Sequence, residues 1–317
     1  MRDIDLGLTE EQSFLRDMVR KFGAEVVRPA GLKLDKLADP EDTIAKDSVL
    51  WDVIRQSREL GLHLGELPQS LGGTMEDMDA MSKIILEEEM GYADGGLAIS
   101  MGVASLPFSM AAMFPSPKFQ ELARAYAEDM KGELIGCWAI SEPDHGSDYM
   151  TDVADPTVSP QVKAVLKGDE YIVNGQKAAW VSNGTIASHA VVHVGLDPSK
   201  GMKGQGLAII PLDLPGISRG KPLDKIGQRP LNQGEIFFED ARIPKEYMVF
   251  TPDMGIIEGS REIKISQVNG SMALVFAGLA KAAYDEASTM RRSAFRVACL
   301  STSTRTSNSN YSGCSAR

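Results

Sequence analysis

The sequence is poor in cysteine and in positive charge, and each shortage excludes a class of protein. Its three cysteines in 317 residues cannot form a disulfide framework, and none has metal-ligand spacing, so no metal site is predicted. The formal net charge of −11 argues against the basic face that a nucleic-acid-binding protein presents. We therefore expect neither a disulfide-rich secreted domain nor a nucleic-acid partner.

Long apolar runs are also scarce in the sequence. We identify no run of about 18 apolar residues, the length that a membrane-spanning helix needs. The opening residues, "MRDIDLGLTEEQ", are acidic and lack the apolar segment of a signal peptide. These features predict a cytoplasmic protein without a membrane span. Its 43% hydrophobic and 24% charged residues are typical of a globular chain.

Helices are predicted for the first third of the chain. The segment "LTEEQSFLRDMVRKFGAEVVRP" opens with a capping box from Thr9 to Gln12, and its apolar residues recur at helical spacing. The same spacing appears in "VLWDVIRQSRELG", where Gly61 stands at the position of a C-terminal glycine cap. Two more helices are predicted in "MEDMDAMSKIILEEEMGYAD" and "SPKFQELARAYAEDMKG". Together these segments predict an N-terminal all-α domain over residues 1–130.

The middle third has the pattern of short strands. The segment "EYIVNGQKAAWVSNG" is interpreted as two strands joined by a turn at Asn174 and Gly175. Further strands are predicted in "SHAVVHVG", "GQGLAIIPLDL" and "GEIFFEDARIP", with no helix between them. The glycines of "GMKGQG" precede a strand and not a helix, so they predict a turn and not a dinucleotide site. The sequence therefore predicts an antiparallel β-barrel or sandwich domain over residues 131–250.

Helical character returns in the last part of the chain. The segment "EIKISQVNGSMALVFAGLAKAAYDEASTM" predicts one long helix within residues 251–290, which makes the fold class α+β and multidomain. From Arg291 onward the composition changes, because this tail holds five arginines and no acidic residue. The 290 residues before it carry 28 basic and 44 acidic side chains. Residues 291–317 are therefore predicted to be a disordered tail.

Three motifs, in this order, resemble those of the acyl-CoA dehydrogenase family of flavoproteins. The signature EPxxGSD occurs from Glu142 to Asp148, followed by "YIVNGQKAAWVSNG" and then by "DKIGQRPLNQGEIFFEDARIPKEYM". The likeness covers roughly residues 5–290. It implies an N-terminal helical domain, a middle β-domain and a C-terminal four-helix domain with FAD held among them. Only the first helix, a stub of that last domain, is expected here.

The resemblance also implies the residues of the site. The residues expected to contact FAD are Trp138, Ile140, Ser141, Ser147, Trp180 and Ser182. Trp180 would pack against the isoalloxazine and Ser182 would donate toward its N5 atom, whereas the alternative for Trp180 is a half-buried strand aromatic. Ser147 would contact FAD or the thioester, and Asn269 stands where the family usually has a substrate-binding arginine.

The family reaction is α,β-dehydrogenation of an acyl-CoA thioester. A carboxylate removes the α-proton, flavin N5 accepts the β-hydride, and the electrons pass to an electron-transferring flavoprotein. The usual base lies in the last third of the C-terminal domain, and the alternative position falls at about Val268, which is no base. Glu262, Asp285 and Glu286 are interpreted as ordinary helix-surface residues, and His145 is given no role. No catalytic base is therefore assigned.

The tail contains the family pattern in another reading frame. When residues 294–316 are back-translated with permitted codons and read from the third base of the Ala294 codon, they give "VQGGVPIYEHQNIQLKLFRMFS". The family follows its long helix with R-x-x-G-x-P-I-x-x-x-Q, and this frame supplies the G-x-P-I-x-x-x-Q part of that pattern at the same distance. We interpret the chain as C-terminally truncated by a frameshift near Met290; the alternative is a genuine Ser-, Thr- and Arg-rich tail.

Truncation would have consequences for assembly and activity. The resemblance implies a homodimer or homotetramer, when full length, through the C-terminal helices. Without those helices, Leu274, Val275, Phe276 and Leu279 are expected to be exposed. Three alternatives to an active dehydrogenase therefore stand: an inactive remnant, a non-catalytic acyl-CoA- or flavin-binding fragment, and an acyl-CoA oxidase.

Overall fold

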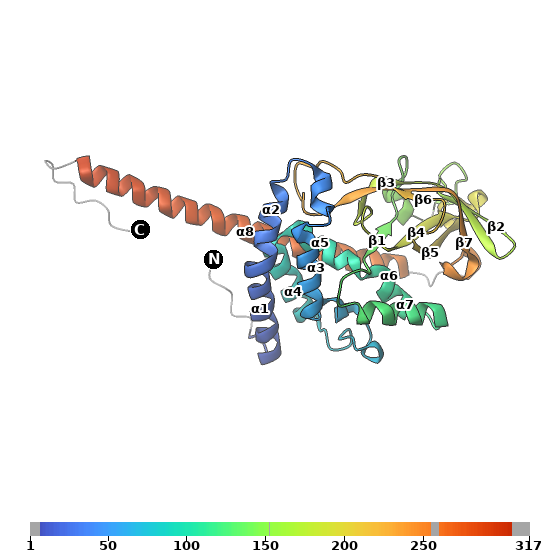
Figure 1. Cartoon of the computed structure of the whole chain (residues 1–317), viewed down its shortest axis with the longest axis horizontal. Coiled ribbons are helices and arrows are strands. Elements are labelled where there is room, and N and C mark those ends of the chain that lie inside the picture. Colours follow the sequence, from blue (N-terminus) through green and yellow to red (C-terminus); the bar gives the residue numbers. More distant parts are fainter. Residues whose placement is uncertain (1–6, 152, 255–259, 306–317) are drawn as a thin grey trace.

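Helices form the first part of the chain, strands the middle, and one long helix runs back along the first part (Figure 1). The computed structural model describes residues 7–151, 153–254 and 260–305. The N-terminal helices are α1 (Glu10–Phe22), η1 (Gly23–Val27), α2 (Arg28–Asp35), η2 (Pro40–Ile44), α3 (Val49–Glu59), η3 (Leu62–Glu66), η4 (Gln69–Leu71), α4 (Ala80–Ala93), α5 (Gly95–Ala104), α6 (Leu106–Ala112) and α7 (Pro117–Glu128).

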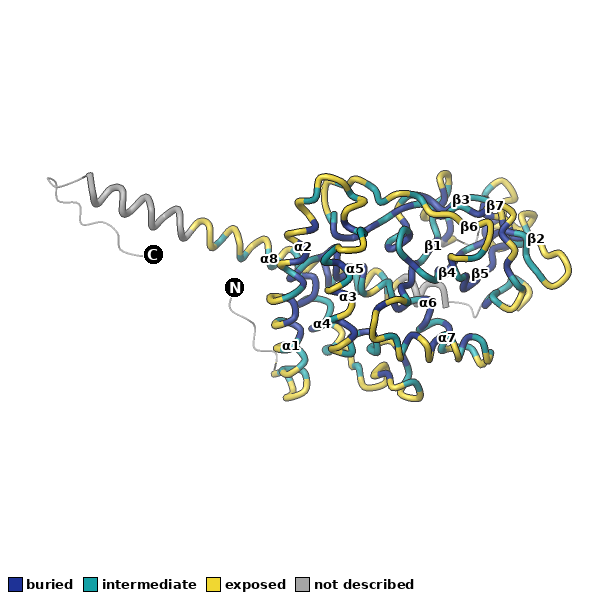
Figure 2. The backbone as a smooth tube through the Cα atoms, in the orientation of Figure 1, coloured by how far each residue is buried: buried dark blue, intermediate teal, exposed yellow. Residues whose placement is uncertain are grey.

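Local sequence signals set several of these helix ends. The Thr9 hydroxyl accepts from the Gln12 amide at 3.2 Å, and the Thr9 amide donates to the Gln12 side chain at 3.1 Å, so the predicted capping box is confirmed. Gly61 follows α3 with a φ of 72°, which confirms the predicted glycine cap. Buried residues of α1, α3, α4 and α5 then form the helical core: Val19, Phe22, Leu50, Val53, Met90 and Leu97. Figure 2 colours the buried parts of the chain dark blue.

The middle of the chain forms an eight-stranded sheet around its own core. Its strands are β1 (Gly136–Ala139), β2 (Lys163–Lys167), β3 (Glu170–Ser182), β4 (His189–Gly195), β5 (Gln205–Pro211), β6 (Ile217–Arg219), β7 (Gln233–Pro244) and β8 (Met248–Phe250). The order is β6-β7-β3-β2-β4-β5-β8, with β1 on β4. The β1–β4 and β2–β4 pairings are parallel, so the predicted antiparallel pairing holds only for the other pairs. Short helices η5 (Ser147–Met150), η6 (Pro198–Gly204), η7 (Lys245–Tyr247) and η8 (Pro252–Met254) join or follow the strands.

The predicted turn at Asn174 and Gly175 is wrong. Strand β3 runs through both residues, and the chain reverses near Gly168 instead, where φ is 66°. The register of β3 against β7 shifts between Val173 and Gly175, which makes a β-bulge. A Cβ on Gly175 would lie 2.8 Å from the Val162 Cα, so glycine is required by a close approach of the chain and not by a hairpin.

One apolar stretch has the length of a membrane-spanning helix. Residues Gly95–Ala112 reach 18 residues with a mean hydropathy of 1.4, so by length and composition alone they could cross a membrane. In the structure the stretch divides into α5 and α6 and is half buried, with Leu97 and Phe108 fully covered. Its apolar character is therefore explained by its place between the helical domain and the sheet.

The long helix α8 (Ser260–Arg305) lies along α4 and α5 and then extends beyond them (Figure 1). Residues 291–305 continue this helix, so the predicted disorder of the tail is wrong there; the segment lacks the glycine and proline that would end a helix. Residues 306–317 lie outside the described residues. The prediction of four exposed apolar side chains holds only for Phe276, because Val275 is buried and Leu274 and Leu279 are partly covered by the N-terminal helices.

Candidate functional site

The EPDHGSD turn is built on a buried carboxylate. Glu142 is 2% exposed, and its side chain accepts from the Gln161 amide at 2.7 Å and the Val162 amide at 2.8 Å. The Lys177 ammonium lies 3.0 Å from the same carboxylate. These bonds tie the end of β1 to the start of β2 and to β3. Glu142 therefore holds the turn and does not face a ligand.

Lys177 completes this buried cluster. Its Nζ donates to the Ile140 carbonyl at 2.9 Å and to the Tyr149 hydroxyl at 3.2 Å, and the whole side chain is buried. Burial lowers the pKa of Lys177 to about 8, and the charge of Glu142 opposes this shift. Lys177 is not among the residues predicted from the sequence. A lysine at a position of a predicted strand that should point inward was the available signal.

The predicted flavin-contacting residue of β1, Trp138, lies at the outer side of the strand. Cys137 and Ala139 point into the core of the sheet, and Trp138 packs instead toward α6 and α7. The Trp138 indole donates to His193 Nε2 at 3.1 Å, and His193 Nδ1 lies 2.8 Å from the Gln205 amide oxygen. Because the indole only donates, His193 holds its proton on Nδ1 in this arrangement. Ring orientation at Trp138 is thus fixed by residues of β4 and β5.

Ile140 and Ser141 connect this strand to β3. The Ser141 carbonyl accepts from the Ala178 amide at 2.8 Å, which brings the end of β1 beside the second half of β3. That half carries Trp180 and Ser182, whose side chains alternate with the buried Val181. The structure thus brings Ile140 and Ser141 beside the predicted residues of the second motif.

Trp180 and Ser182 face outward. Trp180 is 62% exposed, an unusual degree for a large aromatic side chain in a strand. Ser182 pairs across the strands with Gln233, whose amide nitrogen donates to the Ser182 hydroxyl at 3.1 Å and to the Trp180 carbonyl at 3.1 Å. Gln233 is not among the residues predicted from the sequence, because its partners are about fifty residues away in the chain.

Asn183 joins the site to the helical domain. Its φ is 61°, and its side chain is fully buried. The amide donates to the carbonyl of Ser100 at 2.9 Å and accepts from the Ser100 hydroxyl at 2.7 Å. Ser100 belongs to α5, so this pair fixes the end of β3 against the helices. Asparagine is suited to this position because it tolerates a left-handed backbone and its side chain both donates and accepts.

The remaining predicted residues lie apart from this edge. Ser147 is exposed at the start of η5, in a turn held by the His145 Nδ1–Asp148 carboxylate contact of 2.5 Å. Asn269 is exposed on α8. Within the described ranges, no hydrogen bond joins Asn269 to Trp180 or Ser182. Its role in substrate binding stays a prediction.

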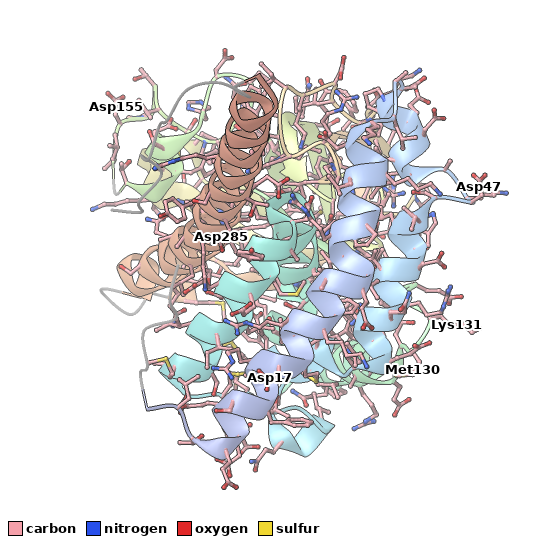
Figure 3. All side chains as sticks on the ribbon, turned by 90° about the vertical axis from the view of Figure 1, so that its left-hand side faces the viewer. Asp17, Asp47, Met130, Lys131, Asp155 and Asp285 are labelled. Carbon is pink, nitrogen blue, oxygen red and sulfur yellow. The ribbon has the colours of Figure 1, made fainter. Side chains whose placement is uncertain are left out.

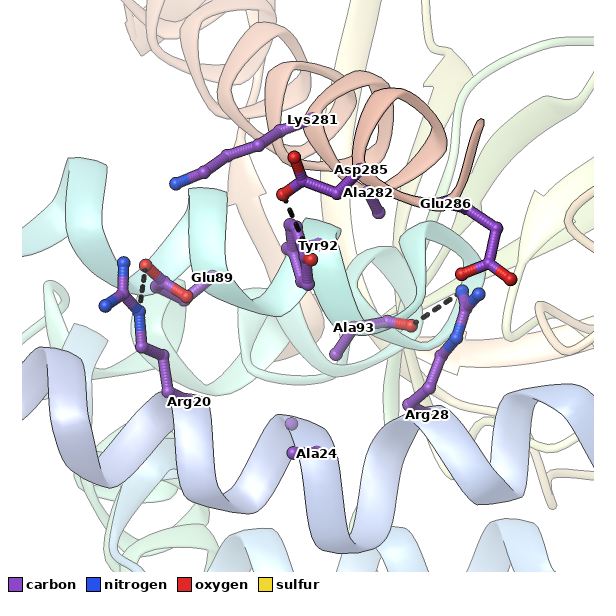
Figure 4. Close-up of a pocket in the computed structure, with 11 residues that line it drawn as sticks. Arg20, Ala24, Arg28, Glu89, Tyr92, Ala93, Lys281, Ala282, Asp285 and Glu286 are labelled. Atoms are coloured by element: carbon purple, nitrogen blue, oxygen red, sulfur yellow. Dashed lines mark hydrogen bonds and ion pairs between the residues drawn. The ribbon is translucent and has the colours of Figure 1, made fainter. Parts of the chain in front are cut away.

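A separate hollow of about 550 Å³ lies between α1, η1, α4 and α8 (Figure 4). Arg20 donates to Glu89 at 2.8 Å, and the Tyr92 hydroxyl donates to Asp285 of α8 at 3.3 Å. Figure 3, a view turned by 90° from that of Figure 1, shows the position of Asp285 on α8. The lining carries both signs of charge and none of the predicted flavin-contacting residues, so we do not place the chemistry there.

Fold and site together define a two-domain α+β chain in which a helical domain and a largely antiparallel β-domain meet along α5, β1 and β3. Residues 9–125 match the family model described as acyl-CoA dehydrogenase, N-terminal domain. Residues 137–241 match the one described as acyl-CoA dehydrogenase, middle domain. The chain therefore belongs to the acyl-CoA dehydrogenase family, as its motifs predicted.

Similar proteins extend over most of this chain. The mitochondrial short-chain specific acyl-CoA dehydrogenase of Rattus norvegicus is 32% identical over 88% of this chain and 62% of its own length. A structure of the electron transferring flavoprotein of Acidaminococcus fermentans is 28% identical with a TM-score of 0.67, covering 88% of this chain and 68% of that chain. Butyryl-CoA dehydrogenase from Megasphaera elsdenii has a TM-score of 0.71 over 90% of this chain and 70% of that chain; at 24% identity it shows the fold alone.

Proposed function

We propose that this chain carries the flavin-binding domains of a FAD-dependent enzyme that dehydrogenates an acyl-CoA thioester between Cα and Cβ. The observation that carries the proposal is the outer edge of β3, where Trp180 is 62% exposed beside the hydroxyl of Ser182. An isoalloxazine is planar, largely apolar and edged with hydrogen-bonding atoms, so an exposed indole beside a hydroxyl suits it. Family membership supports the same cofactor.

The residues of the chain would bind and orient the reacting groups. Trp180 would cover one side of the ring, and Ser182 would donate a hydrogen bond to its edge. The buried Glu142–Lys177 pair keeps the EPDHGSD turn in place, so that Ser147 is presented to solvent beside the strand ends. When bound, FAD supplies the hydride-accepting chemistry that no side chain can supply.

A second candidate function is non-catalytic binding of flavin or acyl-CoA. The observation that favours it lies in α8, where Val268 stands at about the alternative position of the base and has no group that takes up a proton. The chain also spans only 62% of the length of its rat relative. Both candidate functions require flavin or thioester binding, and only the first requires turnover.

Titration of the purified chain with FAD, followed by tryptophan fluorescence, tests the proposal. We expect saturable quenching, and loss of most of it in Trp180→Ala. Dye reduction with butyryl-CoA then separates the two candidates: turnover supports the dehydrogenase, whereas FAD binding without turnover supports the binding protein. A chain that binds neither FAD nor butyryl-CoA would contradict both.

We further propose that an electron-transferring flavoprotein accepts the electrons and that the chain assembles as a homodimer or homotetramer when full length. The likeness to the electron transferring flavoprotein structure from Acidaminococcus fermentans supports the proposed electron acceptor through a relation between the two proteins. The apolar residues exposed on α8, Phe276 among them, support the proposed assembly, because such a surface is covered in stable assemblies.

A further inference from the structure

A series of hydrogen bonds runs from Lys225 through Gln233 to Ser182, and in each bond the earlier residue is the donor. The Lys225 ammonium donates to the Gln233 side-chain oxygen at 2.9 Å, and the Gln233 amide nitrogen donates to the Ser182 hydroxyl oxygen at 3.1 Å. An ammonium can only donate, so the Gln233 oxygen must face Lys225. The amide nitrogen must then face the Trp180 carbonyl, which only accepts, 3.1 Å away. The orientation of the Gln233 amide is therefore fixed at both ends.

This direction decides what Ser182 offers to a ligand. Its oxygen already accepts a hydrogen from Gln233, so the hydroxyl hydrogen is left to point elsewhere. Ser182 lies on the outer side of β3, two residues from the exposed Trp180. Hydrogen bonds in such a series polarise one another, and a positive charge at its start strengthens the final donor.

Lys225 is held in place by the loop before β7. Its ammonium also donates to the Leu231 carbonyl at 2.6 Å. Arg229, in the same loop, donates to the carbonyls of Asp35 at 3.0 Å and Leu37 at 2.6 Å, and so attaches the loop to the helical domain. The loop therefore has a defined position, and the lysine within it cannot swing freely into solvent.

The charge of Lys225 is not neutralised by its contacts. Both acceptors that the described part of the chain gives it are uncharged: a carbonyl and a carboxamide oxygen. Burial alone lowers the pKa of Lys225 to about 8, the direction expected for an ammonium that has lost water without gaining a carboxylate. Holding an ammonium in this way costs free energy, because its two acceptors carry no charge to offset the loss of water.

We infer that Lys225 and Gln233 are positioning residues that turn the Ser182 hydroxyl hydrogen outward, toward a hydrogen-bond acceptor on the edge of the bound isoalloxazine. The inference rests on the proposed binding of FAD. It assigns a function to the third sequence motif, which contains both residues. Neither residue touches the ring itself.

The substitution Gln233→Glu tests the direction of the series. The glutamate has nearly the same size and still accepts from Lys225, but its second oxygen accepts from Ser182 and turns the hydroxyl hydrogen inward. We expect the FAD dissociation constant of the 317-residue chain to rise by about tenfold, the value of one hydrogen bond to the ligand. Lys225→Met is expected to raise it by less, because Gln233 remains.

A double-mutant cycle separates this role from a structural one. If Gln233→Glu acts through the hydroxyl, it should add little to Ser182→Ala, whereas a general disturbance or charge repulsion would add in full. Circular dichroism melts establish that each variant folds. Gln233→Met is a second, uncharged variant, and we expect it to weaken FAD binding when Ser182 is present and not in the Ser182→Ala background. Lys245→Met, at an exposed lysine paired with Asp169 elsewhere on the sheet, is the matched control.

Two results would overturn the inference. Equal FAD affinity in Gln233→Glu and the unaltered chain would overturn it and leave the proposed function intact. Full additivity with Ser182→Ala would do the same. Failure of the unaltered chain to bind FAD would instead overturn the proposed function, and this inference with it.

Discussion

At the scale of single residues, His189 is a polar group that the fold keeps uncharged. Its ring packs edge-on against Phe108, with ring centres 5.4 Å apart, and its Nδ1 lies 3.1 Å from the Ser188 hydroxyl. Burial lowers the pKa of His189 to about 4, with a smaller opposing contribution from Asp213. The histidine is therefore neutral in the folded chain over a range in which it is charged in the unfolded chain.

This difference predicts a loss of stability in mild acid. Between the unfolded pKa of about 6.5 and the folded value of about 4, the unfolded chain binds one more proton, so stability falls as the pH falls. From pH 7 to pH 5, His189 should contribute a loss of about 2 kcal/mol in the free energy of unfolding. Urea unfolding at both pH values should show this contribution in the unaltered chain and not in His189→Asn. Equal pH dependence in the two proteins would contradict the prediction.

At the scale of elements, the contact between α4 and α8 depends on two glycines. A Cβ on Gly91 would lie 2.1 Å from the Val275 carbonyl oxygen, and one on Gly278 would lie 2.0 Å from the Glu88 carbonyl oxygen. The two helices therefore touch backbone to backbone from both sides. Side-chain bonds lock the register of this contact, among them Ser271 to Glu87 at 2.7 Å.

The same substitution at two places in α8 should have opposite effects. Gly278→Ala forces α8 away from α4 and should lower the free energy of unfolding by about 1–3 kcal/mol. Gly270→Ala meets no atom within 4 Å and should raise it by about 0.5–1 kcal/mol, because alanine favours a helix. Urea unfolding of both variants provides the comparison. Changes of the same sign would show that the close contact does not control the packing of α8.

Element types were predictable from local pattern, whereas the site was predictable only in part. Thr9 and Gly61 act through neighbours in the chain, so their caps could be foreseen. The Asn174–Gly175 pair has the local signal of a turn, but Asp240 of β7 bonds the Asn174 side chain and the strand continues. Lys177, Asn183 and Gln233 were missed because their partners lie on other elements. The spacing of residues along the sequence does not indicate such pairs.

At the scale of the whole molecule, Arg229 connects the two domains. Its guanidinium lies in the loop of the β-domain and donates to the carbonyls of Asp35, at the end of α2, and of Leu37, as well as to the Lys225 carbonyl at 3.0 Å. A planar group with several fixed donors can make these bonds at once, whereas a lysine ammonium cannot. The attachment between domains thus depends on the shape of this side chain as well as its charge.

Loss of Arg229 should uncouple the domains. We expect Arg229→Met to lower the melting temperature and to broaden or split the thermal transition, and Arg229→Lys to restore little of the loss. Scanning calorimetry measures both effects. Arg242→Met is the control, since Arg242 is 72% exposed and pairs with Glu170 inside one sheet. A single sharp transition in Arg229→Met, at the temperature of the control, would count against the prediction.

The form of α8 has a mechanical consequence. A straight helix of 46 residues is about 70 Å long, and its first part is clamped to α4 while its end projects past the helical domain (Figure 1). Such a rod behaves as a cantilever whose fixed end lies against Tyr92 and Gly91. A domain or partner attached at the far end of α8 would act on the contact between α8 and α4 with a long lever arm. A small displacement at α4 would, conversely, be magnified into a wide swing at the far end.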